Sequence, residues 1–277
     1  MRIRFEDVSF KYTNTPNERN VLDSLTFELN PENIVGIIGA SGSGKTTLIQ
    51  HFTGLLEPSS GRVLIDDEES GRVGIDPASM RNRIGIVFQF PENQLFEETV
   101  FDDVAFGPRN MGLGESEIQQ RVEESLDLVG LSVKEFGTRS PFHLSEGEKR
   151  RVAIAGVIAM NPDMLVLDEP TACLDPRGVK IIEDILKGLH RLGKQIVIVS
   201  HHMDFIIRLC NRLIVLQNGK IVYDGGKGDI FEKTDLMMRA NILIPRLMQV
   251  VKRLNDFEVI KKSDVYSANE LKTLLID

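Results

Sequence analysis

The sequence has 277 residues, enough for one large domain with a full hydrophobic core or for a main domain with an appendage. Its hydrophobic share of 42% and charged share of 27% are ordinary for a soluble protein, and a net charge of −8 disfavours sequence-independent nucleic-acid binding. The two cysteines lack metal-type spacing, which favours a reducing compartment. The start lacks the apolar core of a signal peptide, and the longest apolar run, residues 152–160, is far short of the roughly 20 residues that span a bilayer. We therefore expect a cytosolic chain.

Two strands are predicted at the start of the chain, over residues 2–12 and 21–29. In the second of them apolar and polar residues alternate, which is the period of a half-buried sheet. We expect a turn over residues 14–20 between the strands. Tyr12, just before that turn, either stacks on an adenine ring or is an ordinary tyrosine of an edge strand, and the sequence favours neither interpretation.

A glycine-rich loop follows the buried run 34–38 and precedes a helical run. It matches in full the pattern of a glycine, four intervening residues and then Gly-Lys-Thr. Glycines let backbone N–H groups surround phosphate oxygens, and the helix start adds further unpaired N–H groups. Lys45 can neutralise the β- and γ-phosphates, and the Thr46 hydroxyl can bind Mg²⁺. The loop therefore predicts a nucleoside triphosphate site formed by Gly39, Ala40, Ser41, Gly42, Ser43, Gly44, Lys45, Thr46 and Thr47.

Short strands continue beyond the first helix. One is predicted at residues 62–65, and together with the first two strands it indicates a small antiparallel layer beside a parallel core. A buried strand at 84–88 ends at Gln89, where ligands gather in open α/β sheets. The Gln89 amide can hold Mg²⁺ or the attacking water, but a solubilising residue at a strand end is the plainer interpretation of a glutamine alone.

Residues 91–160 have a mainly helical pattern. Ser145 and Glu148 form a capping box, with a serine at the cap and a carboxylate three residues later, before a helix expected over residues 149–160. The box is either a plain helix start or a second anion site, at which Ser145 and the N–H of Gly147 point to a ligand.

Charged and polar side chains follow two further buried strands. The strand 164–167 ends at Asp168 and Glu169, and the strand 196–199 is followed by His201. Asp168 can reach the shell of Mg²⁺, and Glu169 can orient or deprotonate a water. His201 can donate a hydrogen bond to a γ-phosphate; a lone histidine is more often structural, but its place after a core strand favours the functional interpretation. Two acids after an apolar run are a weak signal alone and a strong one behind a complete phosphate loop.

The last part of the chain begins with a hairpin at residues 212–224 that turns at Asn218-Gly219. The glycine-rich cluster 225–228 is expected to be a loop. Beyond about residue 234 the pattern predicts two short amphipathic helices, whose apolar faces must be covered. Both the chain's own core and a dimer contact can cover them, and the sequence favours neither.

The phosphate loop, Gln89, the segment 144–148, Asp168-Glu169 and His201, in this order, resemble the ATP-binding-cassette (ABC) ATPases. The resemblance covers residues 2 to about 230. It implies an α/β fold of the P-loop NTPase class, with a parallel core sheet, an antiparallel β-subdomain and a helical subdomain at about residues 91–160. The ATPase domain would span residues 1–234, and a small helical extension, with a possible role in dimerisation, residues 235–277.

The resemblance also implies roles for single residues. Tyr12 would be the adenine-stacking aromatic residue, Glu169 the catalytic base, His201 the γ-phosphate sensor and Gln89 the link to a membrane partner. The segment 144–148, with Ser145, Gly147 and Glu148, would be the family signature. In that family two subunits pair head to tail around two ATP molecules, so that each signature faces the other subunit's phosphate loop.

Residues 88–100 and 103–108 are similar to the ATPases of energy-coupling-factor (ECF) transporters, which include cobalt-uptake ATPases. This implies ATP and Mg²⁺ as cofactors and a peripheral location on the cytoplasmic face of the cell membrane. Implied partners are a second ATPase subunit (a heterodimer being favoured), a transmembrane coupling protein and a membrane protein that binds a vitamin or a transition-metal ion. Nucleic acid is not among them.

The signature departs from its usual form, because Glu146 and Glu148 replace a glycine and a glutamine. Our hypothesis is that the site served by this signature is weaker than the site built on the chain's own phosphate loop. The alternative function is a soluble ABC ATPase that acts on nucleic acid or ribosomes, but the chain lacks the tandem cassettes or long coiled-coil insertion usual there. A non-catalytic scaffold is disfavoured by intact Lys45, Asp168 and Glu169. The sequence does not identify the transported substrate.

Overall fold

Two sheets contain the strands of the computed structural model, which describes residues 1–12, 19–67, 72–73, 83–260 and 265–276. The larger sheet has six strands in the order β10-β9-β3-β8-β7-β6. Its strands run parallel except for β10, which pairs antiparallel with β9. They span Ile34–Ile38 (β3), Ile84–Val87 (β6), Met164–Asp168 (β7), Gln195–Val199 (β8), Arg212–Gln217 (β9) and Lys220–Gly226 (β10).

The smaller sheet is antiparallel and has the order β2-β1-β4-β5. Its strands are Arg2–Phe10 (β1), Leu22–Leu29 (β2), Ser60–Asp67 (β4) and Arg72–Val73 (β5). The predicted parallel core with an antiparallel layer beside it is therefore confirmed. Most of the turn predicted over residues 14–20 lies outside the described residues.

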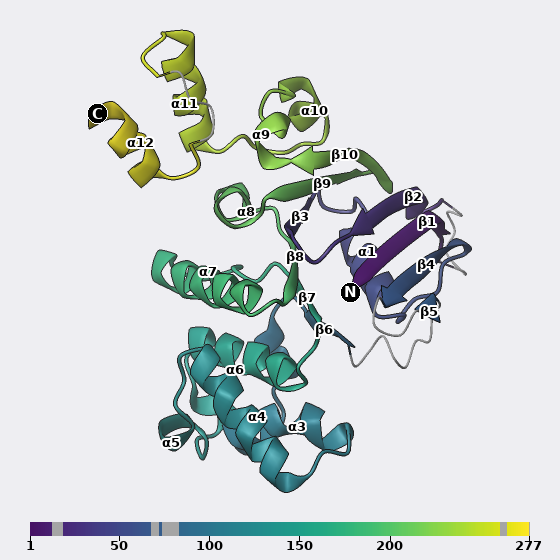
Figure 1. Ribbon diagram of the computed structural model, residues 1–277, viewed down its shortest axis with the longest axis vertical. Coiled ribbons are helices and arrows are strands. Elements are labelled where there is room, and N and C mark those ends of the chain that lie inside the picture. Colours follow the sequence, from purple (N-terminus) through teal and green to yellow (C-terminus); the bar gives the residue numbers. More distant parts are fainter. Residues whose placement is uncertain (13–18, 68–71, 74–82, 261–264, 277) are drawn as a thin grey trace.

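Helices cover both faces of the six-stranded sheet (Figure 1). Helix α1 (Lys45–Phe52) packs between the two sheets, where Leu48, Ile49 and Phe52 join the core of the small sheet. The opposite face is covered by α7 (Pro176–Arg191) and α8 (Met203–Leu209). Side chains of the central strands alternate between these two cores, which explains why their sequences are apolar without interruption.

A helical subdomain extends from one end of the large sheet, at the bottom of Figure 1. It contains η1 (Pro91–Gln94), α3 (Val100–Asn110), α4 (Glu115–Leu128), α5 (Val133–Phe136), η2 (Pro141–His143) and α6 (Glu146–Ala159). Ser145 caps α6 through the predicted capping box. The predicted helix start at residue 149 was three residues late, because the residues of the box that follow the cap are themselves helical.

The C-terminal part forms α9 (Lys227–Ile230), α10 (Thr234–Arg239), α11 (Arg246–Asp256) and α12 (Ala268–Ile276). The prediction of a loop at residues 225–228 was wrong. Gly225 and Gly226 pair with β9, and Lys227 begins α9, because a neighbouring strand supplies the pairing that glycine does not favour by itself.

The amphipathic C-terminal helices bury apolar residues in two places. Met237, Ala240, Ile242 and Met248 join the main core, whereas Val251 belongs to a small separate cluster around α11 and α12. The boundary at residue 234 remains a prediction. None of the helices in the described part of the chain combines the length and the apolar composition of a transmembrane span.

Candidate nucleotide-binding site

The phosphate loop, residues 39–47, joins β3 to α1 at the carboxyl edge of the parallel strands. Gly44 precedes the helix with a φ of 105°, and a Cβ there would lie 2.8 Å from the carbonyl oxygen of Val21. A Cβ at Gly39 would lie 2.2 Å from the carbonyl oxygen of Leu216. The loop is thus packed so closely against the strands behind it that these two positions admit no side chain.

Lys45 turns back over the loop. Its Nζ donates hydrogen bonds to the carbonyl oxygens of Gly39, at 2.8 Å, and Ala40, at 2.9 Å. Burial lowers the pKa of Lys45, and the nearby carboxylates of Glu169 and Asp168 oppose that shift. The ammonium group therefore lies within the loop that the motif predicts to surround the phosphates.

Asp168 and Glu169 lie at the end of β7 and are both buried, with exposed fractions of 7% and 8%. Burial raises the pKa of Asp168 to about 6, and the charge of Glu169 adds to the rise, while Lys45 and a hydrogen bond from Thr46 oppose it. The two acids have different partners, because Asp168 accepts a hydrogen bond from Thr46 whereas Glu169 is bonded to Ser200 and His201. Two adjacent carboxylates are thus available for two separate tasks.

Glu169 is held by the end of β8. Its Oε1 accepts hydrogen bonds from the backbone N–H of His201 at 2.9 Å and from Nδ1 of the same residue at 2.6 Å. Its Oε2 accepts a hydrogen bond from Oγ of Ser200 at 2.8 Å. Ser200 is fully buried and was not predicted as a site residue. The feature of the sequence that could have identified Ser200 is its hydroxyl group, which lies between a buried strand and the predicted histidine.

These residues surround one cleft of about 580 Å³, called the nucleotide cleft below. Most of the phosphate loop lines it, together with Gln89, Asp168, Glu169 and His201. Ser43 does not line the cleft, because its side chain is buried behind the loop. Two lining residues were missed by the sequence analysis, Val21 and Asn241. Neither belongs to a motif, although an asparagine just beyond a helix indicates a helix end.

The donor set of the cleft fits Mg²⁺. Thr46, Gln89 and Asp168 offer hydroxyl, amide and carboxylate oxygens, and all three line the cleft. No group of three or more His, Cys, Asp or Glu suited to a metal occurs within the described ranges. A single carboxylate with other oxygen donors suits Mg²⁺, which takes its remaining ligands from phosphates and water.

Tyr12 lies next to the phosphate loop. Its hydroxyl is 3.2 Å from Oγ1 of Thr47, and its ring packs edge-on against Phe10 at 4.9 Å between centroids. The tyrosine is 42% exposed. It can therefore offer ring surface to a ligand, and its predicted contact with adenine remains a prediction.

Ser145, Gly147 and Glu148 lie away from the phosphate loop. They line a smaller cleft of about 190 Å³ with Asp175 at the start of α7. Oγ of Ser145 donates a hydrogen bond to Oε2 of Glu148 at 2.7 Å, and this bond, with that from the serine N–H, lowers the pKa of Glu148. Glu146 is exposed and pairs with Lys149 at 3.0 Å. Within this one chain the two predicted anion sites are separate.

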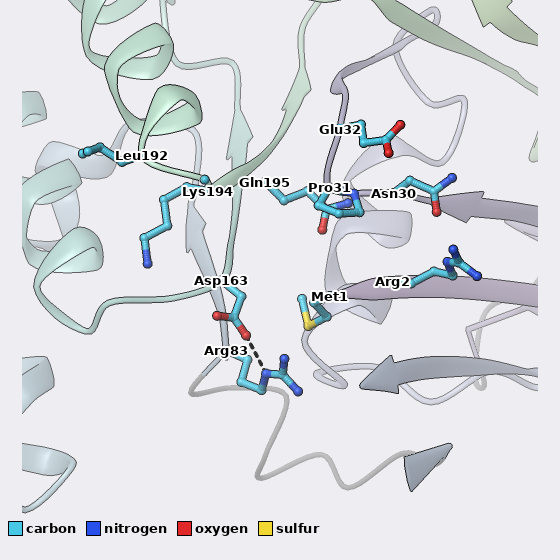
Figure 2. A pocket seen from close by; sticks show the side chains of 11 residues that line it. Met1, Arg2, Asn30, Pro31, Glu32, Arg83, Asp163, Leu192, Lys194 and Gln195 are labelled. Atoms are coloured by element: carbon cyan, nitrogen blue, oxygen red, sulfur yellow. Dashed lines mark hydrogen bonds and ion pairs between the residues drawn. The ribbon is translucent and has the colours of Figure 1, made fainter. Parts of the chain in front are cut away.

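A further cleft, of about 520 Å³, lies at the opposite, amino edge of the parallel strands (Figure 2). Several of its charged residues have partners: Arg83 binds Asp163 at 2.6 Å, and Lys194 reaches the side chain of Asn161 at 2.5 Å. None of the predicted site residues lines this cleft.

Known proteins are similar to this chain in sequence and in structure. A sequence model of the ABC transporter family matches residues 22–172. The chain is 39% identical to the energy-coupling factor transporter ATP-binding protein EcfA2 of Clostridium tetani, covering 100% of this chain and 96% of the relative. It is 43% identical to the protein of the same name from Caldanaerobacter subterraneus subsp. tengcongensis, over 98% and 96% of the two chains.

Two solved structures are similar to the chain. One is cbiO1 from Clostridium perfringens, described as part of the ABC transporter complex cbiONQ, with a TM-score of 0.74, 35% identity and coverage of 90% of this chain and 98% of the other. The second is the dimeric ATP-binding cassette MJ0796 in a post-hydrolysis state with ADP and Pi. Its TM-score is 0.70, at 28% identity and with coverage of 81% and 98%. The chain is therefore an ATPase of the ABC transporter family, in the group of energy-coupling factor transporter ATP-binding proteins.

Proposed function

We propose that this chain is the ATP-binding and ATP-hydrolysing subunit of an energy-coupling-factor type membrane importer for a vitamin or a transition-metal ion. The observation that carries the proposal is the meeting of Lys45, Asp168 and Glu169 around one cleft, in a chain similar over its whole length to EcfA2 proteins. ATP-driven closure of two ATPase subunits would power uptake.

Glu169 is the base in the proposed reaction. A carboxylate at the end of a buried strand can accept the proton of the water that attacks the γ-phosphate. Ser200 keeps the carboxylate in place through Oε2, whereas Oε1 is engaged by His201. The side chain of His201 is 78% exposed and so has room to turn toward the γ-phosphate, which would leave Oε1 available to the water.

Lys45 and the loop amides would bind the phosphates, since Lys45 and most of the loop line the nucleotide cleft. Thr46, Gln89 and Asp168 would hold Mg²⁺, and the ion neutralises charge on the β- and γ-phosphate oxygens when bound. Tyr12 would stack on the adenine.

The separation of the signature from the phosphate loop supports a two-subunit site. Ser145, Gly147 and Glu148 would serve the ATP bound to a second ATPase subunit, in a heterodimer rather than a homodimer. A transmembrane coupling protein would contact the pair near Gln89, and a membrane protein would bind the substrate. The chain would thus lie peripherally on the cytoplasmic face of the cell membrane.

Isolation of the native complex tests this proposal. The tagged chain would be extracted with detergent from cells that express it at its natural level, and its partners identified by mass spectrometry. We expect a second ATPase and two kinds of membrane protein, with ATPase activity in the complex. Recovery of the chain with RNA, DNA or ribosomes, and without membrane proteins, would contradict the importer role.

A further inference from the structure

Asn241 lies where the chain turns sharply after α10. Its backbone N–H donates a hydrogen bond to the carbonyl oxygen of Met238 at 3.0 Å, and that of Ile242 donates to Met237 at 2.8 Å. This pair of bonds is the Schellman ending of a helix, in which the residue at Asn241 must be left-handed, and its φ is 53°. Glycine and asparagine are the residues that suit such a position. The backbone thus explains why a residue of this type is present.

The backbone does not explain where this residue lies. Asn241 lines the nucleotide cleft together with Lys45, Thr46 and Asp168, although some 70 residues separate it from the last of these. It is exposed, and within the described part of the chain its side-chain amide has no hydrogen-bond partner. An amide offers two donors and one acceptor oxygen, so it can bind the oxygen atoms of a nucleotide.

The segment around Asn241 is fixed to the structure that supports the phosphate loop. Nε2 of Gln217 donates a hydrogen bond to the carbonyl oxygen of Arg239. Two residues further along the same hairpin, the N–H of Gly219 donates to the carbonyl oxygen of Ser43, in the loop itself, at 3.0 Å. The β9–β10 hairpin therefore touches both the loop and the end of α10.

Burial fixes the segment further. Ala240 and Ile242, on either side of Asn241, are 2% and 9% exposed and belong to the main core. The backbone between two anchored neighbours keeps its position relative to the cleft, so ligand binding need order only the side chain of Asn241.

We propose that Asn241 is a nucleotide-binding residue, whose side-chain amide donates a hydrogen bond to a phosphate or ribose oxygen of the ATP in this cleft. This inference rests on the proposed function of the cleft as an ATP site. It adds to that site a residue from outside the ABC motifs, in the segment that leads to the C-terminal helices.

Two substitutions distinguish the contribution of the Asn241 amide to ATP binding from that of the left-handed backbone. Asn241→Gly keeps the left-handed ending of α10 and removes the amide, so the fold should be retained. We expect it to weaken ATP binding roughly fivefold to tenfold, the effect of one hydrogen bond.

Asn241→Asp keeps the size of the side chain and adds a negative charge beside the phosphates. We expect a larger loss of ATP affinity, roughly tenfold or more, because the added carboxylate and the phosphates repel each other.

Asn161→Gly is the matched control. Asn161 also follows a helix, α6, has a φ of 56° and does not line the nucleotide cleft. We expect this variant to bind ATP like the wild type. The measurements are the dissociation constants of ATP and 2′-deoxy-ATP with Mg²⁺, by calorimetry on the full-length chain, and the midpoint of thermal unfolding for each variant.

Weaker binding of ATP to both Asn241 variants, with unfolding midpoints close to wild type, would support the proposal. A loss confined to ATP would identify the 2′-hydroxyl as the partner, and an equal loss with 2′-deoxy-ATP would identify another oxygen. Wild-type affinity in Asn241→Gly would overturn the proposal and leave Asn241 as a helix ending alone. Failure of the wild-type chain to bind ATP would instead contradict the proposed function.

Discussion

The two edges of the parallel sheet both carry charged side chains, but these differ in burial and in the way in which the charges are paired. At the carboxyl edge, Asp168 and Glu169 are adjacent, almost fully buried acids, and Lys45 lies beside them. At the amino edge Arg83 and Asp163 form an ion pair at 2.6 Å, with 31% and 45% of their side chains exposed. At the first edge, burial and then the nearby charge of Glu169 raise the pKa of Asp168. At the second edge, opposite charges compensate each other.

This difference indicates where ligand chemistry can occur. Buried carboxylates that repel each other can bind a cation or accept a proton, because either event relieves the repulsion. In an exposed ion pair the charges already compensate each other, so the pair gains little from a ligand. Substitutions at the two edges therefore test this contrast.

Replacing Glu169 by glutamine should have the largest effect. The change keeps the shape and the contact with Ser200 but removes the base, so we expect turnover to fall by about 10² to 10⁴, with ATP binding retained. Phosphate release in the assembled complex measures this. Glu183→Gln, at a buried carboxylate of α7 that pairs with Lys187 and Arg208, is the control for loss of a buried charge. Rapid hydrolysis in Glu169→Gln would disprove the assignment of the base.

Replacing Lys45 by methionine should weaken ATP binding roughly tenfold to a hundredfold, which is the usual effect of losing hydrogen bonds to a charged group. Calorimetric titration with Mg-ATP measures the loss. Lys180→Met is the control, because Lys180 is a largely exposed lysine that pairs with Asp184 on α7. Equal affinities of Lys45→Met and wild type would mean that the charge at the carboxyl edge does not contact the phosphates.

Replacing Gln195 by methionine tests the amino edge. Gln195 is 1% exposed, and neither atom of its amide has a hydrogen-bond partner among the described residues. An apolar side chain of similar size should therefore raise the free energy of unfolding by about 1–3 kcal/mol, as measured by urea denaturation. Gln217→Met, which removes a satisfied amide, should lower it. A less stable Gln195→Met would show that the Gln195 amide is satisfied in solution.

His51 on α1 should make stability depend on pH. It is 1% exposed, its Nδ1 lies 2.7 Å from the carbonyl oxygen of Thr47, and burial lowers its pKa. Below about pH 6.5 the unfolded chain takes up a proton before the folded chain does, so stability falls as the pH drops, by at most about 1.4 kcal/mol per pH unit. Denaturation of wild type and His51→Gln between pH 7 and 5 measures this. Identical pH dependence in the two proteins would refute the assignment.

Replacing Arg83 by glutamine should have the smallest effect. The Arg83–Asp163 pair is partly exposed, so its loss should cost about 1 kcal/mol or less in unfolding free energy and leave ATP turnover unchanged. A double-mutant cycle with Asp163→Asn measures the coupling. A large fall in turnover would mean that the amino edge takes part in function, and would remove the contrast between the two edges.

The sequence by itself determined the chemistry of this protein. The phosphate loop, the acids after β7 and the histidine after β8 are local patterns, in which each residue type follows from its place on a strand or at a helix start. The rule that parallel strands present their carboxyl ends at one edge was enough to predict that these residues meet.

Only the tertiary structure decided what holds those residues and what completes the cleft. Ser200 holds Glu169, the hairpin turn at Gly219 supports the phosphate loop, and Asn241 enters from a segment far along the chain. The same holds for the cluster 225–228, where pairing with β9 produced a strand that glycine does not favour. The physical reason is the same throughout. Local patterns report on neighbours within a few residues, whereas these contacts depend on packing between segments that the sequence alone does not bring together.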